Sequence, residues 1–254
     1  MAKADDMAQF MADKNFTSTH INPLIYKYEG IGEMIKFATA DKKEANAFII
    51  KSKGNSNKIL FVYQEWWGLN DHIKKECEKL YTDLKGTVTV MALDLYDGKV
   101  AMDKETAGKL MQEVKPERCE DIVKGAILYA GDKAKIASIG WCFGGGWSLK
   151  SALLEGKQAV GCIVYYGMPV EEVEKLKTLQ CDVLGIFAEK DQWINKEVVG
   201  KFETNMKMAN KILASKTFPA DHAFANPSNP QFDKKSTEEA YALSLNYLEK
   251  VFSK

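Results

Sequence analysis

The residue of this chain best suited to chemistry is Cys142, within the glycine-rich segment 140–146 of sequence Gly-Trp-Cys-Phe-Gly-Gly-Gly. The segment follows the apolar run Lys135–Ile139 and precedes residues 147–154, which have helical character. The order strand, sharp turn and helix places Cys142 at the apex, where flanking glycines avoid a clash of a Cβ with the strand or the helix. Serine is the usual apex residue, in the G-x-S-x-G nucleophile elbow. Here the nucleophile would be a thiol that attacks a carbonyl carbon.

The same turn also has a purely structural interpretation. Glycine-rich junctions between a strand and a helix commonly carry a small buried residue, and free cysteine is among the most buried residue types. Catalysis by Cys142 requires more, because a thiol is mostly protonated at neutral pH and needs a base or a local charge to become a thiolate. A catalytic role therefore requires a histidine within reach.

The chain has three histidines. His20 lies in the N-terminal arm and His72 at the start of a predicted helix, and both are expected on the surface. His222 directly follows the last predicted strand. Because the catalytic groups of open α/β sheets collect at the carboxyl ends of the strands, His222 is the predicted base.

An acid is then needed to hold the imidazole in the correct tautomer. Asp191, just past the predicted strand 182–188, is the main candidate, and Asp221, next to His222, is the alternative. Adjacent residues on an extended loop point in different directions, which favours Asp191. The order Cys142, Asp191, His222 is also the order found in hydrolases with a nucleophile elbow. The sequence thus predicts a cysteine–histidine–aspartate triad.

Strand-like and helical segments alternate along the chain in the way that positions such a triad. The predicted strands are 36–40, 45–50, 58–63, 87–93, 136–139, 160–166, 182–188 and 211–218. The predicted helices are 71–84, 104–113, 117–130, 147–154, 196–208 and 237–252. The first two strands indicate an antiparallel hairpin, whereas strand 58–63 has too little alternation to have one wet face. We therefore predict an α/β fold, with a mostly parallel central sheet, helices on both faces and an antiparallel N-terminal hairpin. The single domain spans 1–254, and residues 1–20 are a loosely held arm.

The composition limits the classes of function. The 254 residues include 35 basic and 35 acidic ones, interleaved along the chain. The sequence therefore offers no basic face for nucleic acid and no polybasic patch for a membrane. No run of about 18 apolar residues exists, so a transmembrane helix is not predicted. The expected partner is a small metabolite, bound by a monomer or a small homo-oligomer.

The five cysteines are scattered, without a C-x-x-C pair and without a histidine at ligand spacing, so neither a metal site nor a cofactor is predicted. An odd count spread over strands and helices favours reduced thiols. Residues 1–19 are polar and lack the apolar core of a signal peptide. A cytoplasmic location is expected, and a secreted or periplasmic protein with its signal removed would look the same.

Six segments of the chain, taken together, resemble the dienelactone hydrolase family of α/β-hydrolases. They are Gln64–Asn70, Ala92–Tyr96, Gly140–Gly145, Tyr165–Gly167, Lys190–Asp191 and His222–Phe224, and the resemblance extends from about residue 30 to the C-terminus. It implies the α/β-hydrolase fold and the hydrolysis of a small ester or lactone. Cys142 would form an acyl-thioenzyme, His222 would transfer the proton, Asp191 would orient His222, and water would complete the turnover.

The resemblance also implies roles for residues near the nucleophile. In the family, a glutamate at the position of Glu65 faces the resting thiol and helps to deprotonate it when substrate arrives. A strand end beside two tryptophans suits this role, because burial perturbs the proton affinity of a carboxylate. A salt-bridged structural glutamate is the alternative. The oxyanion hole would consist of the backbone N–H groups of Phe143, at a helix N-terminus, and of Trp66.

The chain departs from the family where the substrate is held. Family members that act on dienelactone grip its carboxylate with two arginines, and here the corresponding stretches contain Lys99 and Asn226. The only arginine, Arg118, belongs to a different predicted helix. Lysine lacks the planar bidentate fork of arginine, so the resemblance implies ester or lactone chemistry but not a dienelactone substrate. Lys99 and Asn226 are predicted substrate contacts. Aromatic residues that either line the pocket or pack the core are Trp66, Trp67, Tyr96, Trp141 and Tyr166.

Two other functions are compatible with the same residues. The fold could keep the site but serve as a ligand-binding or regulatory protein, because an acyl-thioenzyme can stall before water attacks. Cys142 could also act as a redox-sensing thiol, although no resolving cysteine is evident in the sequence. Turnover beyond the first acylation distinguishes the hydrolase from both.

Overall fold

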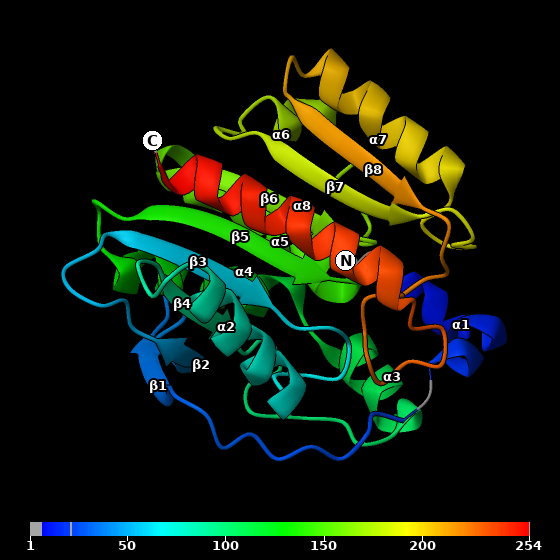
Figure 1. Cartoon of the computed structure of the whole chain (residues 1–254), viewed down its shortest axis with the longest axis horizontal. Coiled ribbons are helices and arrows are strands. Elements are labelled where there is room, and N and C mark those ends of the chain that lie inside the picture. Colours follow the sequence, from blue (N-terminus) through cyan, green and yellow to red (C-terminus); the bar gives the residue numbers. More distant parts are fainter. Residues whose placement is uncertain (1–6, 21, 254) are drawn as a thin grey trace.

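The computed structural model describes residues 7–20 and 22–253, and its centre is one eight-stranded sheet (Figure 1). The strand order is β1-β2-β4-β3-β5-β6-β7-β8. The strands are β1 (Glu33–Ala38), β2 (Glu44–Ile50), β3 (Lys58–Tyr63), β4 (Thr89–Leu93), β5 (Lys135–Trp141), β6 (Ala159–Tyr165), β7 (Val183–Ala188) and β8 (Leu213–Phe218). β2 pairs antiparallel with β1 and with β4, and the other pairs are parallel. This topology confirms the predicted fold class.

Helices cover both faces of the sheet. They are α2 (Asp71–Asp83), α3 (Lys104–Glu113), α4 (Pro116–Ala130), α5 (Phe143–Glu155), α6 (Val173–Leu176), α7 (Lys196–Met208) and α8 (Lys234–Phe252), with the short 3-10 helix η2 (Gly156–Gln158). α2 contacts β2 and β4, and α8 contacts β5, β6 and β7. In Figure 1 these two helices lie in front of the sheet, whereas α4 and α5 lie behind it. Because the faces are covered, the carboxyl ends of the strands are the place for a site.

Local sequence signals explain where the helices begin and which face they bury. The Asp233 carboxylate accepts a hydrogen bond from the N–H of Ser236 at 2.7 Å and so caps the first turn of α8. This cap explains why α8 begins at Lys234, three residues before the predicted start. The buried stripe of α2 is the one that the sequence predicts, and it includes Ile73, Cys77 and Leu80.

The N-terminal arm differs from the prediction of a loosely held segment. Its described part, residues 7–20, contains the 3-10 helix η1 (Ala8–Ala12) and α1 (Lys14–Thr19), and Phe16 is fully buried. The Asp13 carboxylate accepts a hydrogen bond from the indole N–H of Trp193 at 2.9 Å. The arm is held because its apolar side chains find a surface to bury against. Residues 1–6 of the predicted arm lie outside the described residues.

The described residues share one hydrophobic core, while the single-domain organisation stays a prediction. None of the helices within 7–20 and 22–253 has the length and apolarity needed to cross a membrane. The five cysteines are free thiols, and Cys181 is the only one that is not fully buried. Reduced cysteines are what the sequence predicts.

A buried carboxyl group lies at the end of α5, away from the nucleophile. Glu155 is 4 % exposed and accepts a hydrogen bond from the Ser151 hydroxyl at 2.6 Å, and that hydroxyl accepts one from Tyr63, also at 2.6 Å. Burial raises the pKa of Glu155 from 4.5 to about 8. Between these two values the folded chain binds more protons than the unfolded chain. The Glu155 carboxyl therefore makes the free energy of unfolding fall as the pH rises through this range.

We expect Glu155→Gln to remove this dependence, because an amide has no proton to lose. The free energy of unfolding of the variant minus that of the wild type should grow by about 5 kcal/mol between acidic pH and a pH above 8, as measured by urea denaturation. The control is Glu239→Gln, which makes the same substitution at an exposed position of α8. A constant difference for Glu155→Gln would contradict the raised pKa.

Candidate active site

Cys142 is the single residue between the end of β5 and the start of α5, and its backbone has φ 53° and ψ −116°. A residue other than glycine seldom adopts a positive φ, so this backbone is strained. Hydrogen bonds hold it in place: the N–H of Cys142 donates to the carbonyl of Tyr165 at 3.0 Å, and its carbonyl accepts from the N–H of Gly145 at 2.9 Å. The structure therefore contains the predicted elbow, with the sulfur at the N-terminus of α5.

Gly144, in the first turn of α5, has no room for a side chain. A Cβ here would collide with the carbonyl oxygens of Tyr63 and Gln64, where β3 ends. Since backbone atoms cannot yield without disturbing the sheet, we expect Gly144→Ala to lower the free energy of unfolding by about 3 kcal/mol. The matched control is Gly200→Ala in α7, where a Cβ meets open space and is expected to stabilise the helix by up to about 1 kcal/mol. Urea denaturation measures both, and equal changes would contradict the packing argument.

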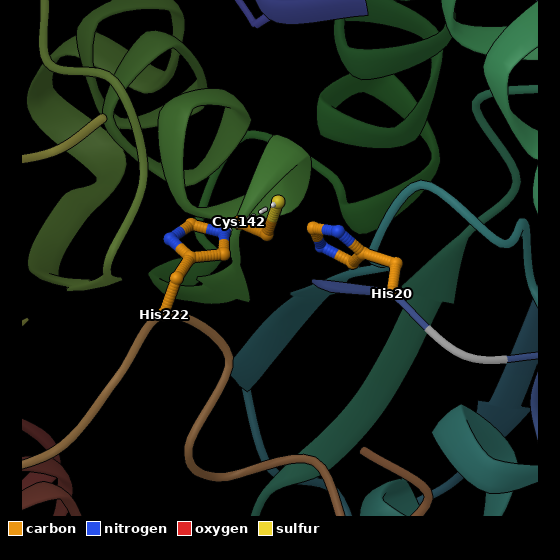
Figure 2. A group of neighbouring side chains, drawn as sticks. All are labelled: His20, Cys142 and His222. Atoms are coloured by element: carbon orange, nitrogen blue, oxygen red, sulfur yellow. Dashed lines mark hydrogen bonds between the residues drawn. The ribbon is translucent and has the colours of Figure 1, made fainter. Parts of the chain in front are cut away.

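A line of hydrogen bonds runs from the sulfur of Cys142 to a carboxylate. Nε2 of His222 lies 3.3 Å from Sγ of Cys142, and Nδ1 lies 2.5 Å from Oδ2 of Asp191 (Figure 2 shows the first contact). Cys142 follows β5, Asp191 follows β7 and His222 follows β8, so each lies past the carboxyl end of a parallel strand. The structure thus brings the predicted triad together. Asp191, and not the alternative Asp221, is positioned to orient the imidazole.

Burial and charge together set the protonation of these groups. Burial raises the pKa of the Cys142 thiol, and the charge and hydrogen bond of His222 offset this only in part. Burial alone would lower the pKa of His222, but the Asp191 carboxylate outweighs it and holds that pKa well above its ordinary value. Burial would likewise raise the pKa of Asp191, but the charge and hydrogen bond of His222 keep it below its ordinary value. Two backbone N–H groups, those of Trp193 and Ile194, also lower this pKa, and each lies 2.9 Å from Oδ1 of Asp191. The Asp191 carboxylate therefore makes the imidazole of His222 a stronger base toward the Cys142 thiol.

Glu65 follows β3 and is 8 % exposed. Its Oε2 accepts a hydrogen bond from the side-chain amide of Asn226 at 2.5 Å, so its observed partner is an amide and not the cation of a salt bridge. Burial raises the pKa of Glu65 to about 7, against the charge of His222 and the hydrogen bond from Asn226, which both lower it. The charge of Glu65 in turn raises the pKa of Cys142. Asn226, predicted as a substrate contact, is therefore placed to hold Glu65.

The two predicted oxyanion donors come from loops on neighbouring strands. Phe143 is the first residue of α5, and its backbone N–H, next to the Cys142 sulfur, lowers the pKa of the thiol. Trp66 follows β3, which pairs with β5 in the sheet. The dipole of α5 adds positive potential at Phe143. Their role as an oxyanion hole stays a prediction.

The aromatic residues predicted near the site are buried, and some of them enclose the imidazole. The ring centroid of Tyr166 lies 5.2 Å from that of His222. Trp66 packs on Trp67 at 4.9 Å, and Trp141 packs on a tyrosine of β6 at 5.5 Å. Tyr166 therefore forms part of the wall around the triad, whereas the contact of Trp141 is a packing contact.

Tyr96 and Lys99 line a cavity of about 230 Å³ whose walls do not include the triad. Arg118 lines the same cavity, and its guanidinium is held by Asp97 at 2.7 Å and by Asp41 at 3.1 Å. The only arginine of the chain is thus engaged in ion pairs. The structure brings Lys99 to this neighbouring pocket and not to the sulfur.

The prediction that His20 is a surface residue is wrong. It is 4 % exposed, and its ring centroid lies 4.6 Å from that of Trp66 and 5.7 Å from that of His222. Burial, followed by the charge of His222, lowers the pKa of His20 to about 3, so the imidazole is neutral. The ring of Phe16 lies 5.9 Å from that of His222. The arm therefore covers the triad, and Cys142 is only 1 % exposed.

Sequence reasoning missed this role of the arm, although one signal was present. Phe16 and His20 are four residues apart, the spacing that places two side chains on one face of a helix. A shared face predicts that the two side chains are buried together, but it does not predict which part of the protein covers them. The second predicted surface histidine, His72, is partly exposed, and its Nε2 lies 2.8 Å from the carbonyl oxygen of Leu24.

Comparison with known proteins gives consistent matches. The sequence profile of the dienelactone hydrolase family matches residues 45–252. Carboxymethylenebutenolidase 1 of Cupriavidus pinatubonensis is 26% identical over 217 residues, which cover 80% of this chain and 90% of that protein. Protein usf of Aquifex pyrophilus is 24% identical over 237 residues, which cover 88% of this chain and all of that protein.

Solved structures share the fold. A dienelactone hydrolase-like promiscuous phosphotriesterase from metagenomic libraries aligns with a TM-score of 0.74 and 19% identity, covering 87% of this chain and 99% of that chain. The dienelactone hydrolase of Anabaena variabilis aligns with a TM-score of 0.64 and 13% identity, covering 87% of this chain and 97% of that chain. Since the family profile matches most of the chain, the chain belongs to the dienelactone hydrolase family, a family of carboxylic ester hydrolases with the α/β-hydrolase fold.

Proposed function

We propose that this chain hydrolyses a small neutral carboxylic ester or lactone through an acyl-thioenzyme. The observation that carries the proposal is the continuous line from Cys142 Sγ through His222 to Asp191, at a strained elbow. Family membership supports the same class of reaction.

The proposed reaction has two halves. His222 Nε2 accepts the thiol proton while the sulfur of Cys142 attacks the carbonyl carbon, and the N–H groups of Phe143 and Trp66 donate to the oxygen that becomes negative. The adduct then collapses, the ester C–O bond breaks, and His222 gives the proton to the leaving alcohol oxygen. Water attacks the thioester with His222 as the base, which releases the carboxylic acid and restores the thiol.

The groups around the sulfur favour a neutral substrate over an anionic one. Asn226 is hydrogen-bonded to Glu65, and Lys99 lines a different pocket, so neither is placed to hold a carboxylate. Glu65 would repel an anionic substrate whenever it is ionised. The Tyr166 ring beside His222 offers an apolar wall.

Substrate reaches the sulfur only when the arm moves aside. Cys142 is 1 % exposed, and Phe16 and His20 of the arm pack beside His222. The hydrogen bond between Asp13 and Trp193 is one of the contacts that hold the arm in place. Access to the site is therefore coupled to the packing of residues 7–20.

We propose that Glu65 is an auxiliary base that can hold the thiol proton before His222 delivers it to the leaving oxygen. Its carboxylate opposes formation of the thiolate, and this opposition ends when Glu65 takes up a proton and becomes neutral. A carboxyl group with a pKa of about 7 is ionised above neutral pH, so kcat/KM should rise as the pH increases through 7.

Glu65→Gln tests this role, because the amide keeps an acceptor for Asn226 but cannot take up a proton. We expect kcat/KM at a pH above 7 to fall by about 10²-fold, and the part of the pH profile that rises near pH 7 to disappear. The measurement is kcat/KM for a p-nitrophenyl ester across pH 5 to 9, with the exposed Glu239→Gln as control. If kcat/KM of Glu65→Gln is unchanged or higher, Glu65 has only a structural role.

The proposed function itself is tested by turnover on a panel of substrates. Short-chain p-nitrophenyl esters and neutral lactones are compared with a lactone that carries a carboxylate. Steady release well beyond one equivalent per chain, faster for the neutral substrates, is the expected result. A burst of one equivalent without further release would favour the ligand-binding or regulatory alternative.

A further inference from the structure

Three potential metal ligands from distant parts of the chain meet at the nucleophile. One ring nitrogen of His20, Sγ of Cys142 and one ring nitrogen of His222 all lie within 4.8 Å of one another. Figure 2 shows the two imidazoles on either side of the sulfur. The 3.3 Å between Nε2 of His222 and Sγ already matches the spacing of about 3.5 Å between two ligands of a tetrahedral zinc ion. A movement of His20 by about 1 Å would complete the set.

Both imidazoles are oriented as metal-bound histidines are. A carbonyl oxygen can only accept a hydrogen bond, so Nδ1 of His20, 2.6 Å from the carbonyl oxygen of Phe16, carries the hydrogen. Nδ1 of His222 donates to the Asp191 carboxylate in the same way. In the neutral form of each ring, Nε2 therefore has the lone pair. A carbonyl or carboxylate behind the far nitrogen is the usual support of a metal-bound histidine.

We propose that His20, Cys142 and His222 bind one Zn²⁺ ion through Nε2, Sγ and Nε2, and that the bound ion stops hydrolysis. One thiolate and two neutral imidazoles are a donor set that zinc prefers, and water would fill the fourth position. On binding, the Cys142 thiol releases one proton to solvent, and the sulfur and both nitrogens donate electron pairs to the ion. No group changes its oxidation state.

Inhibition follows because the ion and the reaction need the same electron pairs. The lone pair of His222 Nε2 must be free to accept the thiol proton, and the sulfur of Cys142 must be free to attack. His20 has no part in the proposed reaction, which makes it the ligand that separates metal binding from catalysis. The inhibitory effect rests on the proposed function, whereas metal binding does not.

Cobalt titration of the full-length, reduced and metal-free protein tests the site. Co²⁺ replaces zinc as a visible probe, because a thiolate ligand gives a sulfur-to-cobalt charge-transfer band that does not depend on activity. His20→Asn is the informative variant, since asparagine can still donate to the Phe16 carbonyl but lacks a nitrogen at the position of Nε2. His72→Asn is its control, because this histidine lies outside the cluster, with its Nε2 2.8 Å from the carbonyl oxygen of Leu24.

We expect wild type and His72→Asn to bind one Co²⁺ per chain with the charge-transfer band, and Zn²⁺ to displace it. Cys142→Ala should lose the band, and His20→Asn should bind at least tenfold more weakly. Calorimetry in two buffers should show about one proton released per Zn²⁺. A wild type without the band, or a folded His20→Asn that binds as tightly as wild type, would overturn the proposal. The band without ester turnover would leave the metal site standing while the proposed hydrolase fails, and turnover without the band would do the reverse.

Discussion

Replacing Cys142 by alanine is expected to reduce steady-state ester hydrolysis by about 10³-fold or more. The reason is that the sulfur is the proposed nucleophile, and alanine supplies neither an attacking atom nor a thiol proton for His222 to accept. Release of p-nitrophenol from a short-chain ester is followed well past one equivalent per chain, for wild type and Cys142→Ala at the same pH. The remaining rate reports what the rest of the site contributes without a nucleophile.

The matched control for this experiment is Cys181→Ala. Cys181 is a free thiol that is partly exposed and lies just before β7, so it tests whether loss of any reactive cysteine matters. Its rate should equal that of the wild type. Equal release by Cys142→Ala and wild type would remove Cys142 from the mechanism.

Asp191→Asn is expected to lower kcat by about 10³- to 10⁴-fold with little change in KM. Oδ1 of Asp191 accepts from two backbone N–H groups, those of Trp193 and Ile194. An asparagine must turn its only oxygen toward these donors, which leaves its NH₂ group facing Nδ1 of His222. The imidazole must then carry its hydrogen on Nε2, the atom that has to accept the thiol proton. The variant therefore keeps the shape of the site and loses its base.

Asp221→Asn is the control for this variant, because Asp221 is the neighbouring acid that competes for the same role by sequence. It should leave kcat unchanged, since the imidazole is bonded to Asp191. The measurement is kcat and KM for the same ester, with far-ultraviolet circular dichroism to show that both variants are folded. A larger loss in Asp221→Asn than in Asp191→Asn would reverse the assignment.

The sheet and the triad could be predicted because their signals are local. Cys142, Asp191 and His222 each follow an apolar run closely, and the carboxyl ends of parallel strands meet at one edge of a sheet. The glycines around Cys142 carry the requirement for a tight turn within seven residues of sequence. Where boundaries differ, as at the start of α8, a single capping side chain accounts for the change.

Contacts between distant segments were beyond the reach of such signals. The hydrogen bond between Glu65 and Asn226 joins residues 161 positions apart, and the bond from Trp193 to Asp13 joins residues 180 positions apart. Polar residues in an arm and in a loop look like surface residues until the surface that covers them is known. His20 is the clearest case, because the packing of the arm makes it a neighbour of the nucleophile.

By itself, the sequence determined the elbow, the three residues proposed as the triad and the sheet that carries them, because each depends on residues within a few positions along the chain. The tertiary structure alone decided that the arm covers the sulfur, that Asn226 holds Glu65 and that Arg118 is engaged elsewhere. These contacts depend on which surfaces bury one another, and that choice is made by the free energy of the whole fold and not by any one segment.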